Sequence, residues 1–273
     1  MLASLEQIVA ATRRHVTEAR RMADLRELER QAQEHAPRGF RRALETRGQN
    51  GVAIIAELKK ASPSRGLIRA EFNPESLARE LEGAGAAALS VLTDEEFFQG
   101  SIDNLRAASA STKLPCLRKD FIVDEFQLLE ARAYSADAIL LIVAALSQAE
   151  LIGLTMQAHD YGLDVLCEAH DKEEVQRALD TGCNLIGVNN RDLRTFKVDL
   201  ETAFRLADLI PKNVVRVAES GIQTGADIAR LRAAGYLAFL VGESLMKAES
   251  PGKALQVLIA EASREQPTVS GRR

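Results

Sequence analysis

Between Val52 and Ser263, short apolar runs alternate with longer stretches in which apolar residues recur at helical spacing. The short runs are rich in Val, Ile and Leu, a composition typical of strands that are buried on both faces. Eight such runs occur, and each precedes a predicted helix. The expected strands are Ala53–Leu58, Ala88–Leu92, Cys116–Lys119, Ala138–Val143, Asp164–Glu168, Leu185–Asn189, Val214–Glu219 and Ala238–Val241.

Polar caps and glycines mark the ends of the predicted helices. A short polar side chain before a helix accepts hydrogen bonds from its first N–H groups, and glycine after a helix adopts the left-handed conformation at little cost. The expected N-caps are Asn73 (before Pro74), Asp171, Asp199 and Thr224. The expected terminating glycines are Gly85, Gly162, Gly182 and Gly235.

This alternation predicts an α/β fold in which helices cover a parallel sheet. An open, doubly wound sheet is the competing topology, but no G-x-G-x-x-G follows the first strand. Eight regular units favour closure, so we expect a (βα)8 TIM barrel.

Two segments lie outside the repeat. Apolar residues recur at helical spacing over residues 2–22, which predicts an extra N-terminal amphipathic helix against the bottom or side of the barrel. The expected organisation is a helical extension over residues 1–50, a catalytic barrel over 51–263 and a disordered tail over 264–273.

Composition and charge narrow the classes of partner. The chain has 273 residues, of which 46% are hydrophobic and 27% charged, as in globular proteins. Lys and Arg number 35 against 39 Asp and Glu, and the resulting charge of −4 argues against a nucleic-acid partner. The longest apolar run, Ala138–Leu146, is half as long as the roughly 18 residues of a membrane span. We therefore expect neither nucleic acid nor membrane as a partner.

The cysteines and the N-terminal residues indicate the cellular compartment of the protein. Cys116, Cys167 and Cys183 are odd in number and lack C-x-x-C spacing, which argues against a disulfide framework and a zinc site and favours core packing. No apolar segment of signal-peptide type follows Met1, and residues 1–50 mix basic with acidic side chains. We expect a cytoplasmic protein without a metal.

Functional groups gather where the predicted strands end, which is where barrels of this kind carry their active sites. Alternation along the first strand places Glu57 and Lys59 on one face. Other strand ends contribute Lys119, Glu168, Asn189 with Arg191, and Glu219-Ser220. The thirteen-residue loop 60–72 is longer than usual for such a connection and suits a mobile, anion-seeking cover.

Glycines follow the last two strands, in Glu219-Ser220-Gly221-Ile222 and Val241-Gly242-Glu243-Ser244. Barrels often bind phosphate between these strands, through backbone N–H groups and a helix N-terminus. The sequence therefore predicts a small phosphorylated ligand.

Six ordered motifs resemble the indole-3-glycerol phosphate synthase family, and the resemblance extends from about residue 53 to residue 252. They are Glu57-Leu58-Lys59-Lys60-Ala61-Ser62-Pro63-Ser64, Leu89-Ser90-Val91-Leu92-Thr93-Asp94, Phe97-Phe98-Gln99-Gly100-Ser101, Leu117-Arg118-Lys119-Asp120-Phe121, Asn189-Asn190-Arg191-Asp192-Leu193 and Glu219-Ser220-Gly221-Ile222.

The resemblance implies a carboxy-lyase of tryptophan biosynthesis that needs no cofactor. Such an enzyme converts 1-(2-carboxyphenylamino)-1-deoxyribulose 5-phosphate to indole-3-glycerol phosphate, with loss of CO2 and water. By resemblance Lys119 is the general acid, Lys59 a second ammonium and Glu168 the principal base. Whether Glu57 shares the role of base stays open.

The resemblance also implies a substrate-binding set. Its members are Ser62, Phe98, Phe121, Asn189, Arg191 and Ser220, with Gly221, Gly242 and Glu243 in the phosphate pocket. Glu243 is expected to act through its backbone N–H, with a carboxylate that turns away from phosphate. His170 is interpreted as a solvated loop histidine.

Two alternative functions remain. Another phosphosugar barrel, such as phosphoribosylanthranilate isomerase, would need a carboxylate and a thiol rather than two lysines. A non-catalytic phosphosugar-binding protein could keep Ser220, Gly221 and Gly242 without the lysines and carboxylates, yet here all persist. The chain is expected to act as a monomer or weak homo-oligomer.

Overall fold

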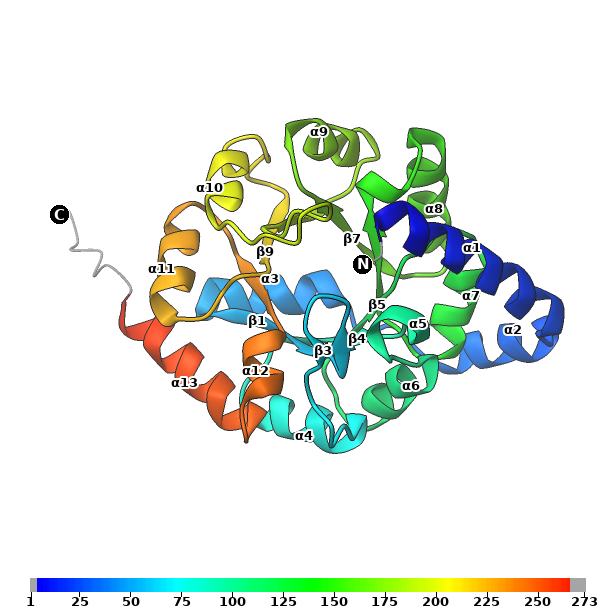
Figure 1. Ribbon diagram of the computed structural model, residues 1–273, viewed down its shortest axis with the longest axis horizontal. Coiled ribbons are helices and arrows are strands. Elements are labelled where there is room, and N and C mark those ends of the chain that lie inside the picture. Colours follow the sequence, from blue (N-terminus) through cyan, green and yellow to red (C-terminus); the bar gives the residue numbers. More distant parts are fainter. Residues whose placement is uncertain (1–3, 266–273) are drawn as a thin grey trace.

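The computed structural model describes residues 4–265, and in it eight parallel strands form a closed barrel (Figure 1). Each strand pairs with its neighbour in the repeat, and the first pairs with the last through Ile55 and Leu240. The expected eightfold barrel is therefore confirmed. The strands are β1 (Ala53–Leu58), β4 (Ala88–Leu92), β5 (Cys116–Lys119), β6 (Ala138–Ile142), β7 (Asp164–Ala169), β8 (Leu185–Asn189), β9 (Val215–Glu219) and β10 (Ala238–Val241).

A ring of helices surrounds the barrel, one after each strand. They are α4 (Pro74–Gly83), α6 (Ile102–Ala110), α7 (Phe126–Ala133), α8 (Gln148–Asp160), α9 (Lys172–Asp180), α10 (Glu201–Ala207), α11 (Gly225–Ala233) and α13 (Pro251–Arg264). Shorter elements occupy the loops at the carboxyl ends of the strands: β2 (Ala61–Ser62), β3 (Gly66–Leu67), α5 (Glu95–Phe98), the 3-10 turn η1 (Val143–Ala145) and α12 (Glu243–Lys247).

The strand boundaries differ from the expected ones by no more than one residue. β6 ends at Ile142 because Val143 begins η1, β7 continues to Ala169, and β9 begins at Val215. Such small differences are normal, since strand ends depend on hydrogen bonds to neighbours that a single run of sequence does not specify.

Three of the four expected helix caps are confirmed. Asn73, Asp171 and Thr224 are N-caps, and each accepts a hydrogen bond from a backbone N–H of the first turn. The prediction for Asp199 was wrong by one residue, because Leu200 is the N-cap of α10. Asp199 Oδ1 still accepts a 3.0 Å hydrogen bond from the N–H of Glu201.

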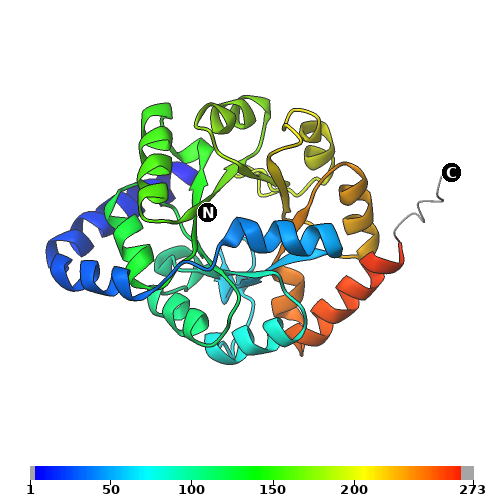
Figure 2. The ribbon, with the colours of Figure 1, turned by 180° about the vertical axis from the view of Figure 1, so that it is seen from behind.

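Three helices precede the barrel: α1 (Leu5–Met22), α2 (Leu25–Glu34) and α3 (Phe40–Asn50). The expected amphipathic helix is α1; it packs on the side, against α7 and η1, and Leu5 and Ile8 reach the mouth of the barrel. The bottom is closed instead by α3, which crosses it in Figure 2 and inserts the buried Phe40 and Leu44 into the barrel interior.

Two layers of apolar side chains stabilise the fold. One fills the barrel, and the other lies between the strands and the surrounding helices. Cys116, Cys167 and Cys183 are buried, free thiols of the outer layer, as expected for core packing.

The last helix extends into the segment that was expected to be a disordered tail. α13 includes Arg264, where the tail was expected to begin, and residues 266–273 of that tail lie outside the described part of the chain.

Within residues 4–265, no helix is both long and apolar enough to cross a bilayer.

Candidate active site

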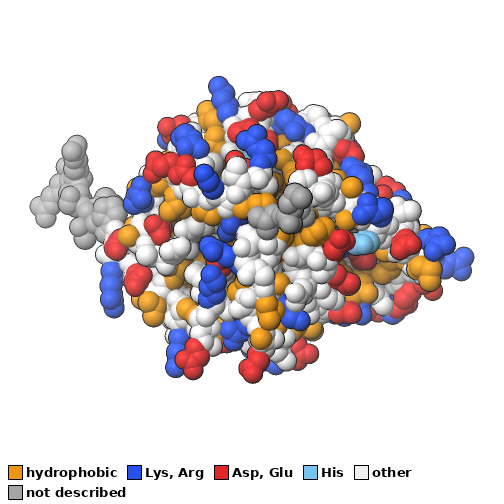
Figure 3. Space-filling model, viewed as in Figure 1, with side chains coloured by type: hydrophobic (Ala, Val, Ile, Leu, Met, Phe, Trp, Pro, Cys, Tyr) orange, Lys and Arg blue, Asp and Glu red, His pale blue; other side chains and the backbone are white. Residues whose placement is uncertain are grey.

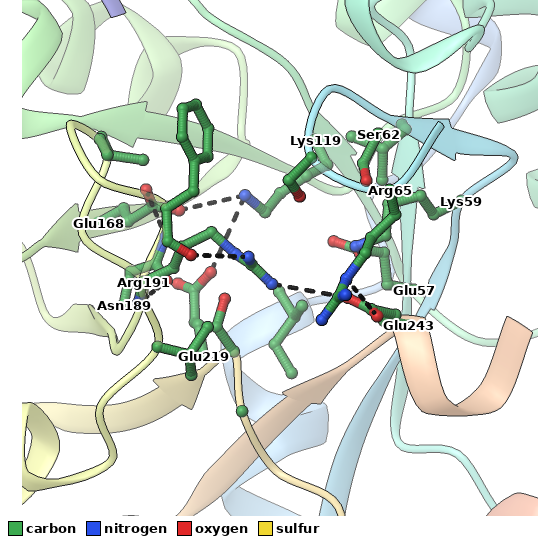
Figure 4. A pocket seen from close by; sticks show the side chains of 18 of the residues that line it. Glu57, Lys59, Ser62, Arg65, Lys119, Glu168, Asn189, Arg191, Glu219 and Glu243 are labelled. Atoms are coloured by element: carbon green, nitrogen blue, oxygen red, sulfur yellow. Dashed lines mark hydrogen bonds and ion pairs between the residues drawn. The ribbon is translucent and has the colours of Figure 1, made fainter. Parts of the chain in front are cut away.

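A cavity of about 940 Å³ opens at the carboxyl ends of the barrel strands. Strand alternation explains its polar lining: Ile55, Leu117 and Leu166 fill the barrel interior, and the side chains two residues further along the same strands point into the cavity. Figure 4 shows the side chains at such strand ends: Glu57, Lys119, Glu168, Asn189 and Glu219.

The best-formed pair in the cavity joins Lys119 and Glu168. Lys119 Nζ lies 3.1 Å from Glu168 Oε2, and Asn189 Nδ2 donates a 3.1 Å hydrogen bond to Glu168 Oε1. Burial opposes ionisation of Glu168, but the Lys119 charge and the neighbouring His170 and Asn189 hold the pKa of this carboxyl well below its usual range. Burial also opposes the charge of Lys119, and nearby carboxylates outweigh it and raise the pKa of the ammonium. Both groups are therefore ionised at neutral pH.

Glu219 is a buried carboxyl to which the sequence analysis gave no role. It is 2% exposed, its Oε2 lies 3.9 Å from Lys119 Nζ, and its Oε1 has no hydrogen-bond partner among residues 4–265. Burial, followed by the negative charge of Glu168, raises the pKa of Glu219 to about 8. At neutral pH Glu219 therefore holds a proton while Glu168 does not.

Strand parity explains why Glu219, which the sequence placed at a strand end, points into the barrel. Val215, Val217 and Glu219 alternate along β9, so the carboxyl continues the row that fills the barrel. Gly187 on β8 leaves room for it, because a side chain at that position would overlap Glu219 Oε1.

A second ion pair crosses the end of β1. Lys59 Nζ contacts Glu57 Oε1, as the shared face predicted, and both side chains line the cavity. Gly242 does not line the cavity; it backs Glu57, whose side chain occupies the space that a Cβ at position 242 would need.

The expected phosphate-binding residues lie together at one side of the mouth. Ser220 and Gly221 both have positive φ, at 64° and 82°, and turn the chain immediately after β9. Gly242 is the N-cap of α12, and no side chain caps the first turn of this helix. Ser220, Gly221 and Glu243 line the cavity.

The expectation that the Glu243 carboxylate turns away from the pocket was wrong. Its Oε1 lies 3.0 Å from Arg65 Nε and its Oε2 lies 3.6 Å from Arg191 Nη2. Lys247 Nζ donates a 2.6 Å hydrogen bond to the same carboxylate. Three cations from three segments attract Glu243 into the mouth, where Figure 4 shows it opposite Arg65 and Arg191.

Two aromatic rings belong to the apolar part of the cavity lining. The ring centroids of Phe98 and Phe121 lie 6.3 Å apart with planes inclined by 39°, and both rings line the cavity. Ser62, on β2, also lines the cavity. The loop that was expected to be mobile pairs β2 with β3 through Ser62 and Gly66, so Arg65 is held at the turn of a short hairpin.

His170 is not the solvated histidine that the sequence suggested. Its side chain is 14% exposed and lies between Glu168 and Glu174. His170 follows β7 in the short connection to α9, and there its imidazole lies between Glu168, which lines the cavity, and Glu174 of α9.

Charges of both signs are interspersed over the face that carries the mouth (Figure 3). No broad area of one sign covers this face in that view. The cations that a small anion would meet in the cavity are Lys59, Arg65, Lys119, Arg191 and Lys247.

The fold and this cavity define a class of protein: a barrel enzyme that pairs a buried ammonium with a buried carboxylate for acid–base chemistry. The family model described as indole-3-glycerol phosphate synthase matches residues 5–258. The chain is 59% identical over 259 residues to the indole-3-glycerol phosphate synthase of Koribacter versatilis (strain Ellin345), covering 95% of this chain and 100% of that protein. The chain belongs to the indole-3-glycerol phosphate synthase family.

Further comparisons agree with the family and the fold. The indole-3-glycerol phosphate synthase of Burkholderia ambifaria (strain MC40-6) is 48% identical over 252 residues, which cover 92% of this chain and 97% of that protein. Among solved structures, a 3-hexulose-6-phosphate synthase has a TM-score of 0.61 at 14% identity, covering 77% of this chain and 99% of that one. The latter likeness concerns the fold alone.

Proposed function

We propose that this enzyme closes the pyrrole ring of indole-3-glycerol phosphate, with the buried Lys119–Glu168 pair as its acid and base. In the reaction the aryl carbon that bears the carboxylate attacks the ketone carbon, CO2 leaves, and the new hydroxyl then leaves as water. The observation that carries the proposal is the 3.1 Å contact of an ammonium and a carboxylate, both buried in one cavity.

Lys119 is proposed to donate the proton that makes the ketone reactive. An aryl carbon is a weak nucleophile, and the ketone carbon becomes sufficiently electrophilic as its oxygen gains a proton. The carboxylates around Lys119 keep its ammonium charged in a site where burial alone would favour the neutral amine. The Lys119 side chain therefore carries the proton that it donates before each turnover begins.

Glu168 is proposed to remove the ring proton whose loss completes the pyrrole. Its charge is maintained by Lys119 and its orientation by Asn189. Glu219, which holds a proton at neutral pH, supplies a neutral donor beside this base. Over the whole reaction the enzyme donates two protons to the substrate and removes one. One proton is therefore taken up from solvent in each turnover, because the substrate carboxylate leaves as CO2.

The remaining residues are proposed to hold the substrate. Phe98 and Phe121 contact the aryl ring, and Ser62, Asn189 and Arg191 bind its polar groups. Lys59, held by Glu57, binds an anionic group of the substrate and assists the departure of water. The support is their common position around one cavity.

Phosphate is proposed to bind at the turn after β9 and the start of α12. Backbone N–H groups at Ser220, Gly221, Gly242 and Glu243 suit an anion there. Because the Glu243 carboxylate pairs with Arg65 and Arg191, substrate phosphate competes with it for these cations.

Product formation tests the proposed activity directly. The chain has no Trp and three Tyr, so indole fluorescence excited at the red edge of protein absorption is seen against a dark protein. With the carboxyphenylamino substrate, we expect this fluorescence to appear as the substrate chromophore disappears. If neither change occurs, the assignment of the activity is wrong.

Inorganic phosphate is expected to raise the melting temperature. A ligand that binds only the native state stabilises it by about 2.7 kcal/mol at a hundredfold excess over Kd. Gly221→Val should abolish the shift, because a Cβ there would lie 2.5 Å from Val198 Cγ1 at the proposed pocket. Differential scanning fluorimetry measures both effects.

Gly182→Val is the matched control for that experiment. Gly182 has a φ of 78°, close to the 82° of Gly221, but nothing lies within 4 Å of the Cβ position. Both variants carry similar backbone strain, and only Gly221→Val should lose the response to phosphate. Equal responses in the two variants would locate the phosphate elsewhere.

The alternative functions lack their key groups. An isomerase that uses a thiol needs a cysteine at the mouth, whereas Cys116, Cys167 and Cys183 lie in the layer between strands and helices. A binding protein has no use for a buried ammonium paired with a buried carboxylate, since the pair costs desolvation without contributing chemistry.

We also propose a cytoplasmic enzyme that acts as a monomer or weak homo-oligomer. Three buried free thiols suit a reducing compartment. The groups with proposed roles line one cavity of one chain.

A further inference from the structure

His170 is a half-buried histidine held by the helix that follows it. Its Nδ1 lies 2.9 Å from Glu174 Oε2, and its backbone N–H donates a 2.8 Å hydrogen bond to the same oxygen. Glu174 is fixed in turn by the first turn of α9, where its own N–H donates to the N-cap Asp171 at 2.9 Å. The imidazole ring therefore has one defined orientation.

The other ring nitrogen of His170 faces the proposed base. Nε2 lies 3.4 Å from Glu168 Oε1 and makes no hydrogen bond to any residue between 4 and 265. A ring with a carboxylate at each nitrogen is stabilised with protons on both. Burial disfavours the charged ring, but the nearby carboxylates of Glu168 and Glu174 outweigh burial and raise the pKa of His170 to about 10.

Glu168 and Glu219 have different neighbours although they share a cavity. Lys119 from β5 reaches both carboxyls, at 3.1 and 3.9 Å. Asn189 Nδ2, from β8, donates its hydrogen bond to Glu168, and His170 Nε2 faces Glu168 as well. The charge of Glu57, from β1, acts unfavourably on ionised Glu219. Both carboxyls lie within 4 Å of the same ammonium, and two like charges around one cation do not both ionise easily, so the pair retains one proton near neutral pH.

We propose that His170, oriented by Glu174, is a positioning residue that places the shared proton on Glu219 and leaves Glu168 as the ionised base. The imidazolium stabilises negative charge on Glu168 and has no contact with Glu219. This inference rests on the proposed function, because it explains which of two buried carboxyls is free to take the proton of the substrate.

Carbon-13 NMR of protein labelled at the glutamate δ-carbon reads the protonation of each carboxyl without any turnover. Signals are assigned with Glu168→Gln and Glu219→Gln and then followed through a pH titration. In the wild type, Glu168 should give an ionised signal and Glu219 a protonated signal at pH 7. In His170→Gln, the titration of Glu168 should move upward by about one to three pH units.

Two further variants separate electrostatics from folding. Glu174→Gln keeps the ring but removes its partner, so it should move the Glu168 titration in the same direction by a smaller amount. His159→Gln removes an exposed histidine on α8 and should leave both titrations unchanged. The acid limb of the kcat/KM profile should move with the Glu168 signal in each variant.

An unchanged Glu168 titration in folded His170→Gln overturns the inference, and so does a loss of rate that is equal at every pH. Neither result contradicts the proposed ring-closing activity. That activity is contradicted if the wild type forms no indole-3-glycerol phosphate. Conversely, the NMR titration remains a valid test of the inference even if the substrate is a different one.

Discussion

Lys119→Ala is expected to reduce kcat by at least the hundredfold to ten-thousandfold that general acid catalysis typically contributes. The alanine variant has no group that can protonate the ketone oxygen from the same position. Because the proton is needed mainly in the transition state, a reduced substrate analogue should still bind. Steady-state kinetics and calorimetric titration with the analogue measure the two quantities.

The control for this variant is Lys113→Ala, which removes an exposed lysine outside the cavity. It should keep the wild-type kcat. A kcat within a few-fold of wild type for Lys119→Ala would remove Lys119 from the role of acid. Loss of analogue binding as well would show that the ammonium holds the ground state rather than the transition state.

Glu168→Gln is expected to lower kcat by a similar factor of about 10² to 10⁴ while retaining substrate affinity. The amide has nearly the size of the carboxyl but cannot take up the ring proton. Its oxygen can accept a hydrogen bond from Lys119 or from Asn189, so one of these donors loses its partner. The free energy of unfolding should fall by about 1–3 kcal/mol for that reason.

Glu173→Gln, an exposed position in the first turn of α9, is the matched control. It makes the same chemical change outside the cavity and should alter neither kcat nor stability appreciably. Near-normal turnover in Glu168→Gln, with the control also normal, would transfer the role of base to Glu57 or Glu219.

The barrel itself could be predicted from the sequence because each of its strands is a local feature. A strand buried on both faces needs a continuous apolar run, and the helix after it needs a cap and an apolar stripe, so every unit is visible within about 25 residues. The same parity predicted that Glu57 and Lys59 share a face. That prediction holds because side-chain alternation depends only on the strand's own backbone.

The N-terminal helices show what local patterns miss. The link between α2 and α3 is fixed by Arg38, whose Nη2 lies 2.6 Å from Asp137 Oδ2, and Asp137 is 99 residues further along the chain. His35 contacts the same carboxylate from the end of α2. No periodicity within residues 1–50 reports a contact of that range, so the helix that closes the barrel bottom was not separated from the one on its side.

The site residues show the same difference between features set by local sequence and features set by distant contacts. Groups at strand ends were found, because parallel strands bring their carboxyl ends to one edge. The orientation of the Glu243 carboxylate was not predicted, because it depends on Arg65 and Arg191 from two other loops. The contacts of His170 were missed for a similar reason, since its orientation depends on Glu168 of β7 and Glu174 of α9.

Lys119 and Glu168 are proposed to act at different steps of one reaction. Single-turnover rapid quench, with enzyme in excess over substrate and products separated by chromatography, distinguishes these steps. Lys119→Ala is expected to return unreacted substrate, whereas Glu168→Gln is expected to accumulate a ring-closed intermediate that has not completed the pyrrole. Arrest of both variants at the same species, whether substrate or intermediate, would contradict the division of acid and base between these two residues.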